Sequence, residues 1–214
     1  IVKSLTNITK MSIDLAYHTP FDFNQINWEL GNQKALHGND LYHSYYAIQS
    51  LLKTTKAEYI LFWDFKLGNP PSKNILNDLI SKKVDVWHAG LRMGLHDAMW
   101  SLNYVHPLSV FNIDAPNDIE SSSFKMSLRA CLIKTEALQK INYFDFNYSS
   151  YDSAGVDLGY TLLKNGGIIR YSPKFLSHVS TTNVHVTKND QFRFVNKHFG
   201  KKWLLWSCFK NFHE

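Results

Sequence analysis

Asp64 is the residue whose position in the sequence most clearly suggests chemistry, because it ends a continuous apolar segment. Ala57–Trp63 carries aromatic and branched residues, as a buried parallel strand does. In sheets of parallel strands, ligand groups gather beyond the carboxyl ends of the strands, so we predict that Asp64 faces a ligand. The plainer alternative is that its carboxylate caps the turn that follows.

The elements that would position Asp64 alternate between strands and helices. Short apolar segments bounded by Pro or Gly predict strands, and apolar residues at helical spacing predict helices. The predicted strands are Ser12–Tyr17, Ala57–Trp63, Val84–His88 and Ile168–Tyr171, and the predicted helices are Asp40–Thr55, Lys73–Lys82, Glu136–Ile141 and Asp157–Lys164. Ser72 is expected to cap the helix at Lys73. This alternation indicates an α/β fold built from parallel βαβ units.

Length and composition favour one globular domain. The chain has 214 residues, of which 44% are hydrophobic and 19% charged, and this is enough to bury a core. The formal charge of +5 is spread along the chain without a nucleic-acid-binding motif, so we expect no nucleic-acid partner. A basic surface suits anionic diphosphates or acidic lipid equally well. Because we find neither a membrane-spanning segment nor a signal peptide, we expect a cytoplasmic protein, with peripheral association at the membrane surface as the alternative.

Four blocks of sequence, in order, resemble the family-2 glycosyltransferases of the GT-A type. The first is Ala57–Lys66 with Pro70-Pro71, where the family has an apolar strand that ends in an Asp-x-Asp pair. The others are Lys125–Lys134, Ala154–Tyr160 with the following Gly166-Gly167, Pro173 and His178, and the basic-aromatic Phe192–Lys202. The resemblance implies a Rossmann-like, mostly parallel sheet flanked by helices, in a single domain over residues 1–214. The family's first strand has no clear counterpart and is missing or lies before Ile1.

The resemblance also implies an activity, which is transfer of a sugar from a nucleotide-sugar donor to a glycan or a lipid-linked acceptor, with inversion. Asp64 and Lys66 would meet the donor diphosphate, and Asp64 with His178 would hold a divalent metal such as Mn²⁺ or Mg²⁺. Lys66 replaces the second carboxylate of the metal pair, and an ammonium is no ligand for a hard cation. We therefore expect metal binding to be weak or absent, with Lys66 supplying positive charge itself.

On the acceptor side, the resemblance implies that a carboxylate takes the proton of the attacking hydroxyl. The family's Glu-Asp pair at this place is Ala154-Gly155 here, so the base would be Asp157 or Asp152. Arg129 and His88 would line the acceptor site, and Trp63 would stack on a sugar face. The plainer alternatives are a helix-start acid for Asp157, a surface ion pair for Arg129 and core packing for Trp63.

A second function remains open at this point. The altered base and metal positions also fit a glycosyltransferase-like module without catalysis, which would bind a glycan or a partner enzyme within a larger synthase. Asp64, Asp157 and His178 still match the family's pattern, and their presence favours an active enzyme.

Overall fold

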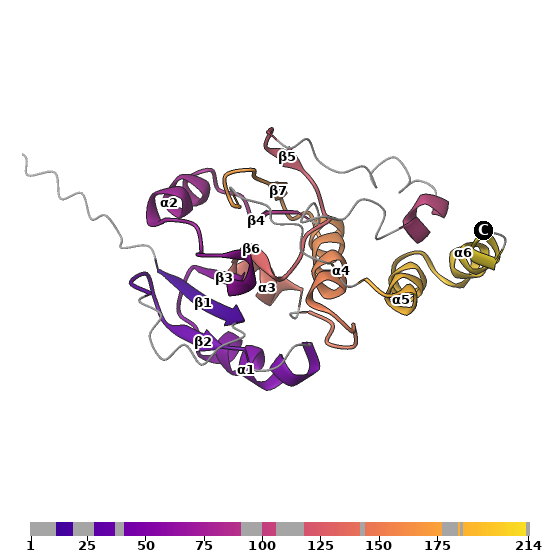
Figure 1. Cartoon of the computed structure of the whole chain (residues 1–214), viewed down its shortest axis with the longest axis horizontal. Helices are drawn as coiled ribbons and strands as arrows, with labels where there is room; N and C mark the ends of the chain where they lie inside the picture. The colour runs from indigo at the N-terminus through magenta and orange to yellow at the C-terminus, as the bar shows by residue number, and fades with distance from the viewer. Residues whose placement is uncertain are drawn as a thin grey trace, which may run out of the picture.

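The computed structural model describes residues 12–18, 28–36, 41–90, 100–105, 118–141, 144–176, 184 and 186–212. Within these residues the chain forms seven strands and six α-helices, arranged as one sheet flanked by helices (Figure 1). The strands are β1 (Ile13–His18), β2 (Gln33–Ala35), β3 (Tyr59–Asp64), β4 (Val86–His88), β5 (Ser121–Ser122), β6 (Ala130–Lys134) and β7 (Ile169–Tyr171). The α-helices are α1 (Leu41–Thr54), α2 (Lys73–Ser81), α3 (Thr135–Lys140), α4 (Tyr151–Lys164), α5 (Lys188–Phe199) and α6 (Lys201–Phe212).

The predicted α/β class is confirmed, but the sheet is mixed where a mostly parallel one was predicted. Its strand order is β2-β1-β3-β6-β4-β7-β5. The pairs β1–β2, β1–β3 and β4–β7 are parallel, whereas β6 runs antiparallel to both β3 and β4, and β5 runs antiparallel to β7. The sequence could not reveal this, because a strand buried on both faces has the same apolar composition in either direction.

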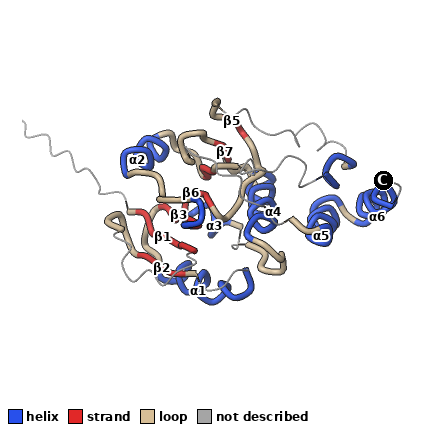
Figure 2. The backbone as a smooth tube through the Cα atoms, in the orientation of Figure 1, coloured by secondary structure: helices blue, strands red, loops and turns tan. Residues whose placement is uncertain are grey.

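Successive strand residues point to opposite faces of the sheet and build two cores. On one face, Ile60 and Phe62 of β3 pack with residues of α1, α3 and α4. On the other face, Leu61 and Trp63 pack with α2 and with Phe175. Figure 2 shows the strands running between these groups of helices.

Side-chain caps fix where the main helices begin. Ser72 Oγ accepts a hydrogen bond from the amide of Ile75, so the predicted cap of α2 is confirmed. Ser150 caps α4 by accepting from the amide of Ser153 at 3.1 Å. The helix α4 therefore begins six residues earlier than predicted, and Asp152 falls in its first turn.

Helices α5 and α6 extend the molecule away from the sheet. Thr187 caps α5 by accepting from the amide of Asp190, and α5 ends at Gly200, whose φ of 87° suits a residue without a side chain. In Figure 1, α4, α5 and α6 follow one another towards the C-terminus, so α6 forms the outermost layer at the end remote from α2.

Candidate functional site

Strands β1 and β3 are adjacent and parallel, and the chain leaves their carboxyl ends in opposite directions. From β1 it passes to β2 on one side, and from β3 it passes through α2 to β4 on the other. Such a reversal of strand order is where open α/β sheets bind their ligands. The last residues of the two strands, His18 and Asp64, are partners in the register at this point.

Asp64 is buried and both of its carboxylate oxygens are engaged. Oδ1 accepts from the backbone amide of Lys66 at 2.9 Å and so caps the short 3₁₀ turn Phe65–Leu67. Oδ2 accepts from Nε of Arg129 at 2.8 Å, in an ion pair whose side chains are 12% and 8% exposed. The turn-capping role expected as the plainer alternative is therefore present, together with a charge partner from a distant part of the sequence.

Arg129 also reaches a second carboxylate. Its Nη1 lies 3.9 Å from Oδ2 of Asp152, which is 2% exposed in the first turn of α4. Ser127 donates its hydroxyl to Oδ1 of Asp152 at 2.5 Å and accepts from the amide of Arg129 at 3.0 Å. One guanidinium thus stands between a carboxylate from the end of β3 and a carboxylate from the start of α4.

His18 completes this group, which we call the carboxyl-edge cluster: His18, Asp64, Ser127, Arg129 and Asp152. The ring centre of His18 lies 4.1 Å from that of Tyr151, and Nε2 of His18 is buried with no hydrogen-bond partner in the described part of the chain. Burial lowers the pKa of His18 to about 4, with Arg129 and Lys66 acting in the same direction and Asp64 opposing them. The imidazole is therefore neutral at pH 7 and offers an unused hydrogen-bonding atom.

Sequence reasoning missed His18, although a signal was present. The strand-end rule that selected Asp64 applies equally to the residue at the end of the predicted strand Ser12–Tyr17. Thr19-Pro20, which follows directly, marks the stop.

Asp157 lies outside the carboxyl-edge cluster and serves a different contact. It is 2% exposed. Its Oδ2 accepts from Lys197 Nζ at 2.7 Å, and its Oδ1 accepts from Tyr148 Oη at 2.9 Å and lies 2.7 Å from Nε2 of His198. Burial opposes ionisation, but the hydrogen bonds from His198 and Lys197 hold its pKa below the ordinary value. Of the two carboxylates expected to act as base, only Asp152 contacts the cluster in the part of the chain that the structure describes.

Of the four remaining predicted site residues, the structure describes three. Trp63 is fully buried, and its Nε1 donates to the carbonyl of Gly68 at 2.9 Å, so it is a core residue and its ring is not open to a sugar. His88 is also fully buried, with Nε2 2.8 Å from the carbonyl of Ser123. Lys66 is exposed beside Asp64, and His178 lies outside the described residues.

Gly155, which the resemblance matches to an acidic residue, has a packing role. A Cβ on Gly155 would lie 2.5 Å from the carbonyl oxygen of Met126 and 2.7 Å from Cα of Ser127. The backbone of α4 therefore rests directly on the segment that carries Ser127 and Arg129. A glutamate or aspartate at this position would force the two segments apart.

The side chains around Asp64 do not fit a divalent cation. Arg129 and the amide of Lys66 already occupy the two oxygens of Asp64, and two positive side chains stand nearby. Within the residues described, no group of three His, Cys, Asp or Glu side chains is close enough to hold a metal ion. A hollow of about 420 Å³ lined by Thr55–Glu58 and by Lys134, Thr135, Glu136 and Gln139 lies at the opposite edge, where β3 begins and β6 ends.

Searches with this sequence found no matching protein-family model and no matching curated protein.

Proposed function

We propose that this chain is a GT-A-like glycosyltransferase domain that works without a bound metal. It would bind a nucleotide-sugar donor at the carboxyl ends of β1 and β3 and pass the sugar to a glycan or lipid-linked acceptor. The observation that carries the proposal is the position of Arg129 between Asp64 and Asp152. This contact joins two blocks of the resemblance, through Asp64 and Arg129, to the first turn of α4, at the point where the strand order reverses.

The charges of the cluster suit a diphosphate. Lys66 is exposed and makes no ion pair within the described residues, so its ammonium is available to phosphate oxygens. The guanidinium of Arg129 is planar and can pair with two phosphate oxygens at once. These two cations would supply the attraction that a metal ion supplies elsewhere.

Asp152 is the carboxylate that best fits the role of base. Arg129 screens it in the free protein, and a diphosphate would draw the guanidinium towards its own, more highly charged oxygens. Asp152 would then take the proton of the acceptor hydroxyl. The hydroxyl oxygen would bond to the anomeric carbon while the bond from that carbon to the phosphate oxygen breaks, and the electron pair would leave with the diphosphate.

The non-catalytic module is the second candidate, and one observation favours it. Both carboxylates are paired with Arg129 and nearly inaccessible, since Asp64 is 6% and Asp152 2% exposed. A domain held in this state would keep the shape of the site and lack a free base.

Calorimetric titration with a panel of nucleoside diphosphates, with and without Mn²⁺, tests the first step. We expect binding that does not need Mn²⁺. Lys66→Ala should weaken it by about 1.5–3 kcal/mol, the range for a hydrogen bond to a charged group. Lys66→Asp should make binding depend on metal, because it restores a carboxylate beside Asp64. Lys73→Ala, an exposed lysine on α2, is the matched control and should leave binding unchanged.

Release of nucleoside diphosphate from a panel of nucleotide sugars, measured with candidate acceptors, then separates enzyme from module. Asp152→Asn should abolish turnover and leave nucleotide affinity in place. Nucleotide binding without turnover in any pairing favours the module. Tight Mn²⁺ binding by the unmodified protein, or no effect of Lys66→Ala on nucleotide affinity, contradicts the proposed role of Lys66.

A further inference from the structure

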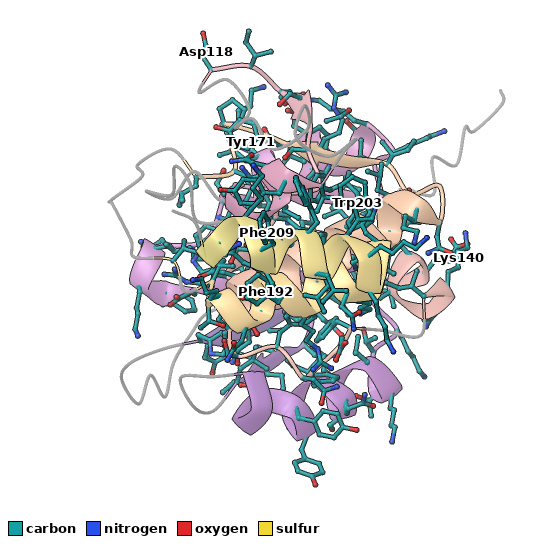
Figure 3. All side chains as sticks on the ribbon, turned by 90° about the vertical axis from the view of Figure 1, so that its right-hand side faces the viewer. Asp118, Lys140, Tyr171, Phe192, Trp203 and Phe209 are labelled. Carbon is teal, nitrogen blue, oxygen red and sulfur yellow. The ribbon has the colours of Figure 1, made fainter. Side chains whose placement is uncertain are left out.

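Helix α6 turns an apolar face to solvent. Leu205, Trp206 and Phe209 are 71%, 45% and 54% exposed, and at about 100° per residue they occupy one side of the helix. The rings of Trp206 and Phe209 are stacked, with centroids 5.9 Å apart. In Figure 3, α6 lies at the front of the molecule and Phe209 is labelled on it. Large apolar side chains gathered on an outward face mark an interaction site.

The inward side of the same helix is partly polar, which is the reverse of an ordinary surface helix. Ser207 is fully buried, and its carbonyl accepts from Nδ2 of Asn211 at 2.6 Å. The hydroxyl of Ser207 and Oδ1 of Asn211 are buried and find no hydrogen-bond partner among the residues that the structure describes. The helix thus buries polar atoms while exposing leucine, tryptophan and phenylalanine. Its exposed apolar face therefore does not serve to pack the helix against the core.

Positive charge surrounds this apolar face. Lys201 and Lys202 are exposed at the start of α6, and Nζ of Lys210 lies 5.2 Å from the centre of the Trp206 ring. The neighbouring α5 adds exposed Lys188, whereas its exposed Arg193 and Lys197 both pair with Asp145. In the described stretch 186–212, the sole acidic side chain is Asp190, which is 5% exposed and accepts the hydroxyl of Ser149.

We propose that α6 docks on the surface of an anionic lipid bilayer, with Leu205, Trp206 and Phe209 entering the interface and Lys201, Lys202 and Lys210 meeting the headgroups. Aromatic rings favour the boundary between headgroups and acyl chains, and lysines near the surface are attracted to anionic lipid. No helix in the described part of the chain is long and apolar enough to cross a membrane, so the contact lies on the surface. This inference does not depend on the proposed activity.

The charges also argue against a second copy of the chain as the occupant. In a symmetric dimer through α6, the same patch would face itself and bring the lysines of both copies together. Like charges at close range repel, and the exposed residues of α5 and α6 offer no carboxylate to offset this. An anionic lipid surface would attract the lysines of α6, whereas a second copy of the chain would repel them.

Vesicle flotation with the full chain tests the proposal. We expect the protein to float with vesicles of phosphatidylcholine containing about 30% phosphatidylglycerol, and to stay largely unbound with pure phosphatidylcholine. Raising the salt from about 0.05 M to about 0.5 M should weaken binding, because lysine–headgroup attraction is screened. Equal binding to both vesicle types, or no binding to either, overturns the proposal.

Two pairs of variants identify the surface. Leu205→Ser/Trp206→Ser/Phe209→Ser should lower the partition coefficient at least about tenfold, since it removes the apolar insertion. Tyr46→Ser, at an 81% exposed aromatic on α1, is its control. Lys201→Glu/Lys202→Glu should lower it at least about thirtyfold. Lys53→Glu/Lys73→Glu changes net charge equally elsewhere and should have much less effect.

Outcomes that place binding elsewhere also count against the proposal. If the α6 variants float as the unmodified protein does, another surface binds lipid. If sedimentation shows a concentration-dependent dimer that only the α6 variants abolish, and vesicles do not compete with it, the face is a protein interface.

Discussion

His18 and Asp64 stand side by side as the last residues of β1 and β3, on two strands that the chain leaves in opposite directions. Their neighbours complete a polar group enclosed by the fold. Asp64 pairs with Arg129, and no described residue hydrogen-bonds to Nε2 of His18. Buried polar atoms are nearly always satisfied, and under the proposed function the bound donor would supply the partner that this nitrogen lacks.

Replacing Arg129 with Met should be strongly destabilising. It would leave Asp64 and Asp152 buried without their cation, so we expect the free energy of unfolding to fall by about 3–5 kcal/mol. Asp64→Asn combined with Arg129→Met should cost less than the sum of the single changes, because the uncompensated charge of Asp64 is gone and only that of Asp152 remains. Urea unfolding of the four proteins measures this. Lys134→Met, which breaks an exposed pair with Glu136, should cost about 0–1 kcal/mol. If the effects of Asp64→Asn and Arg129→Met add strictly, the ion pair between Asp64 and Arg129 contributes nothing to stability.

Asp157→Asn should loosen α5 from α4. Asp157 is the shared partner of Lys197 and His198, and the neutral amide would lose both charge-assisted contacts. We expect faster amide hydrogen exchange across α5 and α6 and little change in β1 and β3. If the variant instead keeps its exchange pattern and loses sugar transfer, Asp157 is the base after all. Lys164→Ala, on the same helix and exposed, should change neither property.

Gly155→Ala should separate α4 from the segment that carries Ser127 and Arg129. The new methyl group would meet backbone atoms at 2.5–2.8 Å, which cannot move independently. We expect a loss of about 1–3 kcal/mol in the free energy of unfolding, as for other overpacked sites. A matching loss of nucleotide affinity is expected, because Arg129 shifts with its segment. A crystal structure with α4 unmoved would contradict this reading.

The protein should become less stable as the pH is lowered, and the buried His88 is one cause. Burial lowers the pKa of His88 to about 4, against the hydrogen bond to Ser123, so the unfolded chain binds more protons than the fold between pH 4 and the ordinary pKa of 6.5. Stability is therefore full above pH 6.5 and is lost as the pH falls. We expect His88 to account for about 2 kcal/mol between about pH 7 and about pH 5.

His88→Gln is the variant that tests this, because its amide still donates to the Ser123 carbonyl and does not titrate. The unfolding free energy of this variant should fall less steeply between about pH 7 and about pH 5. The remaining pH dependence includes that of His18, whose pKa is also lowered by burial. Equal pH slopes for the two proteins would exclude His88 as a source.

The sequence predicted the central elements well because their signals are local. The buried strand before Asp64, the Ser72 cap and the helical face of α1 all follow from residues within one segment. It predicted no strand at β6, and so not its antiparallel direction, and it missed the early start of α4. Strand direction depends on the path of the whole chain, and Tyr151–Val156 has a pattern that β-strands and loops share.

The grouping of side chains in the candidate site was predicted in part. Asp64, Asp152 and Arg129 were among the candidates and lie together in the structure, whereas Asp157 turned out to contact α5. Asp152 and Asp157 are five positions apart on one helix, so they point in different directions. That difference could be seen only once the start of the helix was known. The burial of Trp63 could likewise be seen only in the structure, because the sequence of a strand does not show whether the face that carries an aromatic residue is covered or open.

The two outer strands of the sheet limit how it can associate. β2 is three residues long, with Gln33 and Lys34 exposed, and β5 at the other side has only Ser121 and Ser122. A strand from another molecule would gain few backbone hydrogen bonds at either side and, at β2, would meet a charged side chain. Fibril-like growth by strand addition is therefore disfavoured at both sides, so crowding at a surface need not lead to aggregation through the sheet.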